Sequence, residues 1–290
     1  MSQTARTIAR VIRSVSGMEG EDMPIRRAFA AHGNVFVDPF IMLDHFGPSE
    51  IGPGSRGFPP HPHKGFETVT YMLSGEMEHR DSTGNRAVIG PGDVQWMTAG
   101  AGIVHSETPP EAFKAQGGTI EGLQLWVNLP KADKEAPAGY QILKAEDLGQ
   151  ANDAMRGVSA IVLAGEVMGA QGPARTFTPM TVAVLTFDAE ATLSLDPAPD
   201  QNAAIYVASG SLAMGRDRHH VKAGETALFE PDDHPITLAA GEPALALYMA
   251  GRPISEPVVA RGPFVMSTEG EIRQAMLDYQ SGKFGTVGSL

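Results

Sequence analysis

Two pairs of candidate metal ligands, each with one residue between its members, constrain this chain more than any other feature of its sequence. His61 and His63 stand near the start of a stretch that opens at Gly57, and His105 and Glu107 close it. In an extended strand, alternate side chains point to the same face, roughly 6.6 Å apart. Two such pairs on neighbouring strands, about 4.8 Å apart, would direct four donors into one pocket. The sequence therefore predicts two adjacent β-strands with a metal site between them.

The donor types favour a transition metal. Three neutral imidazoles and one carboxylate suit Fe, Ni, Co, Cu or Zn better than Ca or Mg, which prefer oxygen ligands. Four protein ligands leave an octahedral ion two open positions, which a catalytic metal needs. The alternative is that these are surface or hydrogen-bonded histidines at chance spacings, since the chain has nine histidines. The repeated spacing between Gly-rich turns favours the metal site.

Composition narrows the class of protein. The chain has 290 residues, about the length of two domains. Its 33 glycines and 22 prolines indicate many turns and short strands, and its net charge of −12 argues against direct binding to nucleic acid or to an anionic membrane. Without cysteine, neither disulfides nor thiolate ligands are available. Because the N-terminus has no secretory signal and no long apolar run follows, we expect a cytoplasmic protein.

Short segments of alternating polarity, separated by turns, predict an all-β fold. Residues 67–73 read as a central strand, and residues 122–129 alternate leucine and valine with other side chains. The turns D-S-T-G-N at 81–85 and G-P-G-D at 90–93 end neighbouring strands. Strands at short, even spacing are typical of a small antiparallel barrel or a double-sheet jelly roll.

The second half of the chain repeats the pattern of the first. A polar, proline-containing linker at 130–139 places the domain boundary near residue 134, which gives domains at 1–134 and 135–290, and a short helix is expected at 145–154. The segment Y-M-L-S-G at 71–75 has a counterpart in Y-V-A-S-G at 206–210.

The metal ligands are missing from that second copy. Counting from the repeated segments puts Asp196, Ala198 and Thr237 at the places of the three histidines. Three other histidines lie in this half, of which two are adjacent and so face opposite ways on a strand. We interpret all three as solvated or structural: His219, His220 and His234.

Two further features have structural interpretations. Asp44 and His45 either orient a ligand imidazole or form a satisfied polar pair on a buried strand. Near the C-terminus, Thr268 is a candidate helix N-cap with Glu271 three residues on. A short amphipathic helix should follow, with its apolar face on a barrel: Ile272, Met276 and Tyr279.

Several longer runs resemble the pirin family, a branch of the cupin superfamily. They are H-P-H-K-G-F-E-T-V at 61–69, P-G-D-V-Q-W-M-T-A-G-A-G-I-V-H-S-E at 91–107 and G-L-Q-L-W-V-N-L at 122–129. The run D-P-F-I-M-L-D-H-F-G at 38–47 is similar to the pirin N-terminal signature. The resemblance covers nearly the whole chain. It implies a bicupin of two β-barrels, with metal in the N-terminal barrel, none in the C-terminal one, and a C-terminal segment that returns to the first.

The resemblance also implies which residues bind iron. They are the four donors named above: His61, His63, His105 and Glu107. The general cupin pattern expects a ligand at Glu67 and has a proline and an asparagine where this chain has Gly100 and Pro109. Since Glu107 takes over in pirins, we expect Glu67 to support the site without binding metal. That expectation rests on the resemblance, because Glu67 lies on the same strand face as His63.

For several members the resemblance implies oxidative cleavage of flavonols of the quercetin type. The expected cofactor is Fe(II), with Ni, Co, Cu or Zn as alternatives, and the expected partners are a flavonol-like substrate and O2. Glu107 is the carboxylate placed to accept the 3-hydroxyl proton. The alternative is an iron-containing regulatory protein that binds and modulates a transcription factor or a metabolic enzyme. An aromatic-sized cavity on the metal would favour the enzyme, and an exposed apolar patch the regulator.

Overall fold

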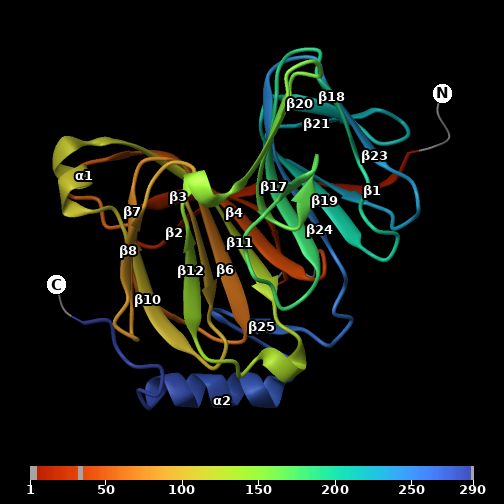
Figure 1. The fold of residues 1–290 in the computed structure, drawn as a ribbon. Coiled ribbons are helices and arrows are strands. Elements are labelled where there is room, and N and C mark those ends of the chain that lie inside the picture. The colour runs from red at the N-terminus through yellow and green to blue at the C-terminus, as the bar shows by residue number, and fades with distance from the viewer. Residues whose placement is uncertain (1–4, 32–34, 289–290) are drawn as a thin grey trace. The chain divides into compact units, whose positions relative to one another are not determined.

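The computed structural model describes residues 5–31 and 35–288 and is mostly β-structure (Figure 1). It divides into two compact units, each discontinuous in sequence. The first barrel comprises Ser16–Phe36, Ile41–Ala145 and Ser255–Leu290, and the second barrel comprises Met1–Val15, Val37–Phe40 and Glu146–Ile254. The predicted all-β bicupin is confirmed. The predicted domains at 1–134 and 135–290 remain a prediction.

Two sheets form the first barrel. The larger has the order β12 (Gly139–Leu143), β9 (Val94–Thr98), β6 (Phe66–Ser74), β11 (Gly118–Asn128), β4 (Phe40–Ile51), β3 (Met23–Ala30) and β2 (Val15–Glu19). The smaller has the order β5 (Phe58–His63), β10 (Ile103–Thr108), β7 (Met77–Asp81) and β8 (Arg86–Ile89). A short helix, α1 (Glu111–Gln116), connects β10 to β11. The strands expected at 67–73 and 122–129 lie in β6 and β11, which pair antiparallel.

The second barrel repeats this arrangement of seven and four strands. Its larger sheet has the order β1 (Ile8–Arg13), β22 (Glu225–Phe229), β19 (Asn202–Ser209), β24 (Ala244–Gly251), β17 (Met180–Phe187), β14 (Val158–Ala164) and β13 (Gly149–Asp153). Its smaller sheet has the order β18 (Thr192–Leu195), β23 (Ile236–Ala240), β20 (Ser211–Met214) and β21 (His219–Lys222). A two-stranded hairpin, β15 (Glu166–Val167) and β16 (Ala170–Gln171), lies beside β13 and β14.

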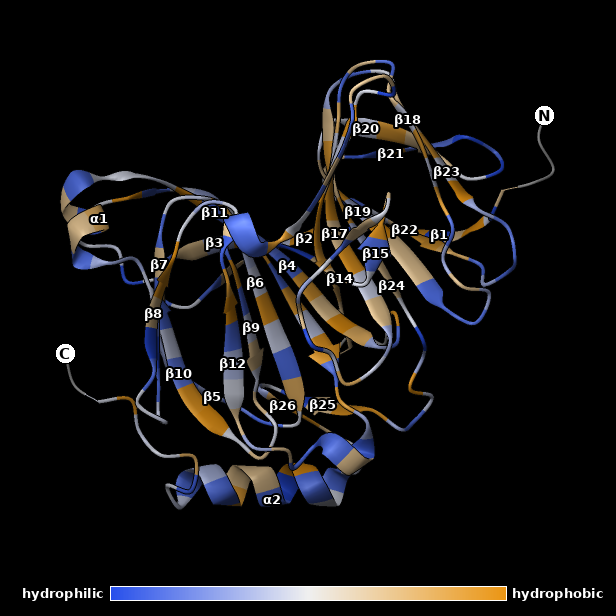
Figure 2. Cartoon of the chain, in the orientation of Figure 1, coloured by the Kyte–Doolittle hydropathy of each residue, from blue (hydrophilic) through white to orange (hydrophobic). Residues whose placement is uncertain are grey.

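Alternating apolar side chains fill the interior of the second barrel. Ile205, Leu212 and Ile236 come from three different strands and are fully buried in one cluster. Figure 2 shows the apolar colour along strands such as β14 and β17 and hydrophilic residues at many of the turns. Each fully buried aliphatic side chain of this kind contributes about 1.5–3 kcal/mol to folding, so the period-2 pattern determines which face of each strand is internal.

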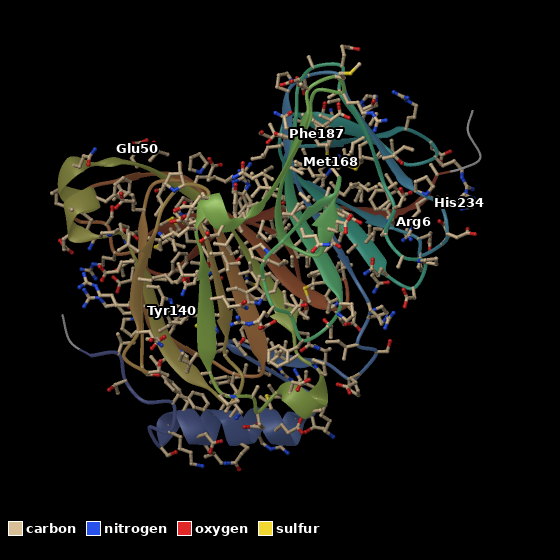
Figure 3. All side chains as sticks on the ribbon, in the orientation of Figure 1. Arg6, Glu50, Tyr140, Met168, Phe187 and His234 are labelled. Carbon is tan, nitrogen blue, oxygen red and sulfur yellow. The ribbon has the colours of Figure 1, made fainter. Side chains whose placement is uncertain are left out.

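Arg6 attaches the N-terminal segment to the second barrel. Its guanidinium is fully buried and donates four hydrogen bonds to carbonyl oxygens, those of His234, Gln201, Pro197 and Ala198. Figure 3 labels Arg6 and His234 beside one another. A buried cation needs such partners, and they place the chain that follows Arg6 so that β1 pairs with β22.

The C-terminal segment belongs to the first barrel. It forms β25 (Val259–Arg261), β26 (Phe264–Met266) and α2 (Glu269–Gln280). The predicted N-cap is confirmed, since the Thr268 hydroxyl accepts a hydrogen bond from the Glu271 N–H at 3.2 Å. Glu271 in turn accepts from the backbone N–H of Ser267 at 3.0 Å. Together these bonds satisfy donors that the first helical turn leaves unpaired.

The buried face of α2 differs in part from the predicted one. Ile272 and Ala275 are buried and pack in one cluster with Phe264. Met276 and Tyr279 were expected on that face. Met276 is 39% exposed, whereas the Tyr279 ring, although 40% exposed, lies 6.4 Å from the ring of Phe264. The helix therefore contacts the barrel through a narrower apolar stripe than the one predicted, with its centre one position before Met276.

The prediction of a helix at 145–154 is wrong. A single 3₁₀ turn, Ala145–Asp147, is followed directly by β13, whose backbone pairs with β14 along its whole length. The ladder with a neighbouring strand outweighs the weak helical preference of this polar segment. A second 3₁₀ turn is Lys131–Asp133. In the described part of the chain, neither α1 nor α2 is long and apolar enough to cross a membrane.

Candidate metal centre

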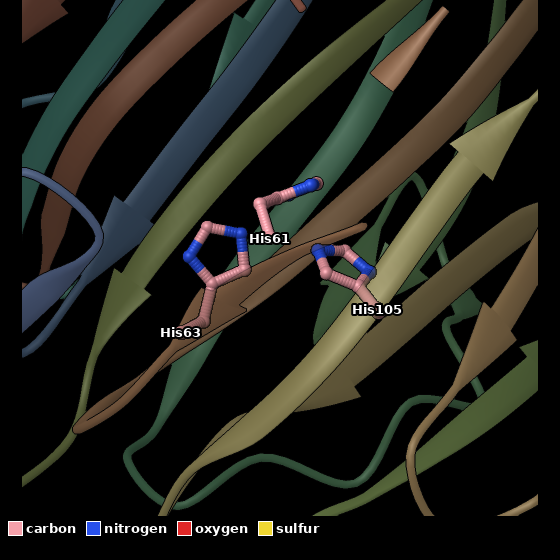
Figure 4. A group of neighbouring side chains, drawn as sticks. All are labelled: His61, His63 and His105. Atoms are coloured by element: carbon pink, nitrogen blue, oxygen red, sulfur yellow. The ribbon is translucent and has the colours of Figure 1, made fainter. Parts of the chain in front are cut away.

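Three histidines converge in the first barrel from two antiparallel strands (Figure 4). His105 on β10 lies directly opposite His61 on β5, and His63 follows two residues later on the same face. The ring centroids are 4.3 Å apart for His61 and His105, 4.8 Å for His61 and His63, and 4.9 Å for His63 and His105. One nitrogen from each ring lies within 4.8 Å of one from each of the others. Such a cluster could hold one metal ion.

Glu107 lies next to this cluster, past a register shift at which β5 has one more residue than β10. Its carboxylate falls within 4.8 Å of ring nitrogens of His79 and His105, but it does not complete a set of that size with the other two histidines. Oε1 accepts a hydrogen bond from the Thr70 hydroxyl at 3.1 Å, and Oε2 accepts one from the Gln124 amide at 2.9 Å. The carboxylate is buried and held by two donors beside the three imidazoles.

The backbone fixes the tautomer of His61. Its Nδ1 lies 2.7 Å from the carbonyl oxygen of Pro59. Because a carbonyl only accepts, Nδ1 carries the proton and Nε2 keeps a lone pair that can bind a cation. The proline-rich sequence before the histidine thus contributes to the site directly.

His79 and Asp81 form a support behind His105 that our reasoning from the sequence missed. The Nδ1 atoms of His105 and His79 are 3.3 Å apart, and Nε2 of His79 is 3.5 Å from the Asp81 carboxylate. Asp81 also accepts hydrogen bonds from Thr83 and Asn85 in the predicted turn. Burial raises the pKa of Asp81, but these hydrogen bonds outweigh it and hold the pKa well below its usual range. The H-x-D spacing at the end of β7 was the available signal.

The cluster fits a bound cation. Burial, followed by the neighbouring histidines, holds the pKa of His63 and His105 well below the usual range, so both rings are neutral as metal ligands must be. Nδ1 of His63 and Nε2 of His105 are buried without a hydrogen-bond partner among the described residues. Buried lone pairs are normally satisfied, and a metal would satisfy these.

Glu67 stands apart from the donor clusters found among the described residues. It accepts a hydrogen bond from the Thr98 hydroxyl at 2.7 Å. Burial raises the pKa of Glu67 to about 7, against the effect of that hydrogen bond. The expectation that Glu67 supports the site without binding metal stays a prediction.

Asp44 and His45 are satisfied polar side chains on β4, the second of the two interpretations made from the sequence. Asp44 accepts two hydrogen bonds from Arg27, at 2.9 and 2.7 Å, and Nε2 of His45 lies 2.8 Å from Glu121. Burial, followed by the charge of Arg26, lowers the pKa of His45 to about 4 and keeps the ring neutral.

A cavity of about 500 Å³ opens beside the histidines. His61 and His63 form part of its wall, together with Gln124, so a molecule in the cavity would touch the cluster. Much of the remaining lining is apolar or aromatic: Ile25, Met42, Phe46, Phe58 and Trp126. The Arg27 and Asp44 ion pair adds a polar patch to the wall.

The second barrel has lost this centre. The repeated Tyr-x-x-x-Gly segments align β20 with β7, and strand pairing then aligns β23 with β10 and β18 with β5. Apolar side chains therefore replace the polar ones: Met214 for His79, Leu238 for Glu107, Ile236 for His105 and Leu195 for His61.

Counting from the repeated segments gave counterparts of the three histidines that are each wrong by one residue. The conclusion that the second barrel lacks these metal donors is nevertheless correct. Asp196, Ala198 and Thr237 each lie one position past the side chain that the strand register selects. The connection from β18 to the repeated tyrosine is one residue longer than its counterpart in the first barrel, and the connection before β23 is one residue shorter. Only the paired strands reveal these changes.

The remaining histidines of this half lie on the surface of the second barrel. His219 and His220 are exposed on β21. His234 is half-buried beside two exposed or half-exposed acidic residues, Asp232 and Asp233. This agrees with a solvated or structural role.

Two family models match the chain. The Pirin model matches residues 22–127, and the model of the Pirin C-terminal cupin domain matches residues 182–285. The first range covers strands of the first barrel, and the second covers strands of the second barrel and continues into the C-terminal segment that belongs to the first. Each range contains one of the two repeated Tyr-x-x-x-Gly segments.

Relatives of similar length extend these matches. A Pseudomonas aeruginosa protein named "Putative quercetin 2,3-dioxygenase" is 41% identical over 268 residues, which cover 91% of this chain and 93% of that protein. A "Pirin-like protein" of Solanum lycopersicum is 40% identical over 291 residues, covering 97% and 93%. The crystal structure of a quercetin 2,3-dioxygenase from Acinetobacter baumannii matches with a TM-score of 0.93 and 33% identity, covering 98% of this chain and 99% of that one.

Proposed function

The chain belongs to the pirin family, and on that premise we propose that it is a metal-dependent dioxygenase that cleaves flavonols of the quercetin type. The observation that carries this proposal is the cavity of about 500 Å³ whose wall includes His61 and His63. Its volume lies in the range of roughly 300–1,000 Å³ that is typical of small-molecule sites. A metal that served only as a regulatory switch would not require an aromatic-lined cavity beside it.

We assign iron(II) to the cluster, with Ni, Co, Cu or Zn as ions that the same donor types accept. The residues that would hold it are the three clustered histidines and the carboxylate next to them: His61, His63, His105 and Glu107. When bound, the metal supplies a Lewis acid and a template that holds the flavonol and O2 together.

Glu107 is the proposed catalytic base, and it accepts the proton of the flavonol 3-hydroxyl. Thr70 donates to one carboxylate oxygen and Gln124 to the other, so two hydrogen bonds fix the orientation of the carboxylate before the substrate arrives. Each oxygen keeps a further lone pair, so one oxygen could bind the metal while the other accepts the proton of the substrate.

The walls of the cavity position the flavonol and exclude water. Phe46 and Phe58 meet edge to face at 6.2 Å, and the Trp126 ring lies 5.2 Å from the His63 ring. These flat side chains suit a planar polycyclic substrate. Excluding water favours reaction of the deprotonated flavonol with O2 over side reactions.

The proposal is tested by oxygen uptake. Iron-loaded protein is expected to consume O2 when quercetin is added, and His61→Ala should lose both the bound iron and the turnover. If the protein binds stoichiometric iron but consumes no O2 with any of a panel of flavonols, this reaction is excluded. The proposed metal site would not be affected by that result.

One observation favours the regulatory alternative. Met276, Leu277 and Tyr279 on α2 leave three large apolar side chains at least 39% exposed on one short helix. An exposed apolar patch of this kind suits a protein partner. A pull-down that retains a partner on iron(II) protein, loses it on iron(III) protein and loses it again in Leu277→Glu would support this role. Retention independent of both the metal state and Leu277 would count against it.

A further inference from the structure

The second barrel contains a cavity of about 1040 Å³ at the position that the metal cavity occupies in the first. The strand register places Leu195 where the first barrel has His61. β24 is the counterpart of β11, since each pairs with the strand that carries the repeated tyrosine, and Tyr248 then takes the place of Gln124. The second barrel has therefore kept a cavity and changed its chemistry.

The buried residues of this cavity lining are apolar except for one hydroxyl group. Leu193 and Leu195 of β18 and Val167 of β15 line it and are buried. Tyr248 also lines it and is only 3% exposed, yet its hydroxyl makes no hydrogen bond to any described residue. Burial raises the pKa of Tyr248, so the group is a neutral hydroxyl that can donate to and accept from a ligand.

The charges at the rim of the cavity exclude anionic ligands. Arg156 is 3.5 Å from Asp153, so the single cation of the lining is already paired. Glu166 and Asp196 add two exposed carboxylates that no cation balances among the described lining residues. They would repel an anion and accept hydrogen bonds from hydroxyl groups.

The remaining wall can adapt to a ligand. Met168 occupies the two-residue turn between β15 and β16 with φ +52°, followed by Gly169 at +80°, the positive pair that a tight hairpin requires (Figure 3 labels Met168). Met155 also lines the cavity and is almost fully exposed. Methionine side chains are flexible and polarisable and pack against varied ring shapes.

We propose that the second barrel binds a small uncharged ring compound that carries hydroxyl groups, independently of the metal in the first barrel. The ring packs on Leu193 and Leu195, one hydroxyl pairs with Tyr248, and other hydroxyls reach the rim carboxylates. This site goes beyond the proposed dioxygenase reaction and does not depend on it.

The test is a titration of protein labelled with ¹³C in its methionine methyl groups, using tyrosol, a neutral phenol with an alcohol side chain. Met155 and Met168 report on the second cavity, and Met42 lines the first, so one spectrum separates the two sites. The two reporters are expected to shift with a dissociation constant in the roughly millimolar range for a ligand of this size. The anion 4-hydroxyphenylacetate, with the same ring, should bind at least several-fold more weakly.

Variants connect the shifts to the proposed contacts. Tyr248→Phe should weaken tyrosol binding by about three- to tenfold, and Ala151→Trp, which fills the cavity from β13, should abolish it. Tyr71→Phe, which removes a buried tyrosine hydroxyl from the other barrel, and His61→Ala should leave the Met155 and Met168 shifts unchanged. Reporters that do not move with tyrosol, equal affinity for the anion, or full affinity in both Tyr248→Phe and Ala151→Trp would overturn the proposal.

Discussion

The Nδ1 atom of His79 lies 3.3 Å from the Nδ1 atom of His105. On its other side, His79 approaches Asp81, whose carboxylate is anchored in the turn after β7. If Asp81 accepts the proton on Nε2 of His79, then Nδ1 of His79 accepts from His105. Nε2 of His105 is then left as a lone pair in the cluster. A chain of three side chains therefore prepares one metal ligand.

Removing this support should weaken metal binding. Outer partners of ligating histidines typically contribute 10- to 100-fold to metal affinity, so His79→Leu should raise the dissociation constant by about that factor. His79→Gln retains a carbonyl acceptor for His105 and should lose less. Competition with a chromogenic chelator measures both variants. Equal affinities in wild type and His79→Leu would show that His105 needs no such support.

Replacing Glu107 should lower the catalytic rate more than replacing a residue that donates a hydrogen bond to its carboxylate. A positioned general base contributes about 10²- to 10⁴-fold, so Glu107→Gln should lower kcat per bound iron within that range. Gln124→Leu leaves the carboxylate but removes its donor on Oε2, and a loss of about tenfold is expected. Both rates need to be normalised to the iron content of each preparation. A Gln124→Leu defect as large as that of Glu107→Gln would contradict the assignment of the base.

Glu67 should make the stability of the metal-free protein depend on pH. Its pKa is about 7 in the folded protein against 4.5 ordinarily, so the folded state binds the proton more tightly. Stability from this group is then present at acidic pH and is lost as pH rises from about 4.5 through 7. Glu67→Gln, which cannot ionise, should be more stable than wild type at pH 8 by up to about 3 kcal/mol, with a smaller difference at pH 5. Urea unfolding at the two pH values measures this, and a pH-independent difference would contradict it.

The N-cap of α2 gives a test of the C-terminal segment. Thr268→Ala removes the acceptor for the Glu271 N–H and should lower the free energy of unfolding by about 0.5–2 kcal/mol. Thr268→Ser keeps the hydroxyl and serves as the matched control. Chemical denaturation of both variants provides the measurement, and equal losses would assign the effect to the threonine methyl group instead.

The sequence predicted the site residues that local spacing places on one strand face. It did not predict those whose place depends on which strands pair. The i, i+2 pairs were informative because a strand places alternate residues on one face whatever its neighbours are. His79 was missed because nothing local indicates that β7 pairs with β10. The same limit explains why Leu195 and Ile236, rather than the residues one position on, replace His61 and His105 in the second barrel.

The overall fold was predicted correctly from the sequence pattern and the family resemblance, but some individual segments were not. The short strands and frequent turns predicted an all-β chain, and the repeated tyrosine segments predicted two similar halves. The segment at 145–154 has no strong pattern of its own, and its pairing with β14 makes it a strand. Met276 was assigned to the buried face of α2 from helical periodicity alone, which gives the spacing of an apolar stripe but not its centre.

The central claim is that the first barrel holds one metal ion among three imidazoles and a carboxylate. Anomalous X-ray diffraction at the iron edge, on crystals of untagged protein purified without chelators and soaked in iron(II), tests it most directly. We expect one strong peak within bonding distance of His61, His63, His105 and Glu107. Diffraction that shows no peak there, or iron bound only at another place in the chain, would contradict it.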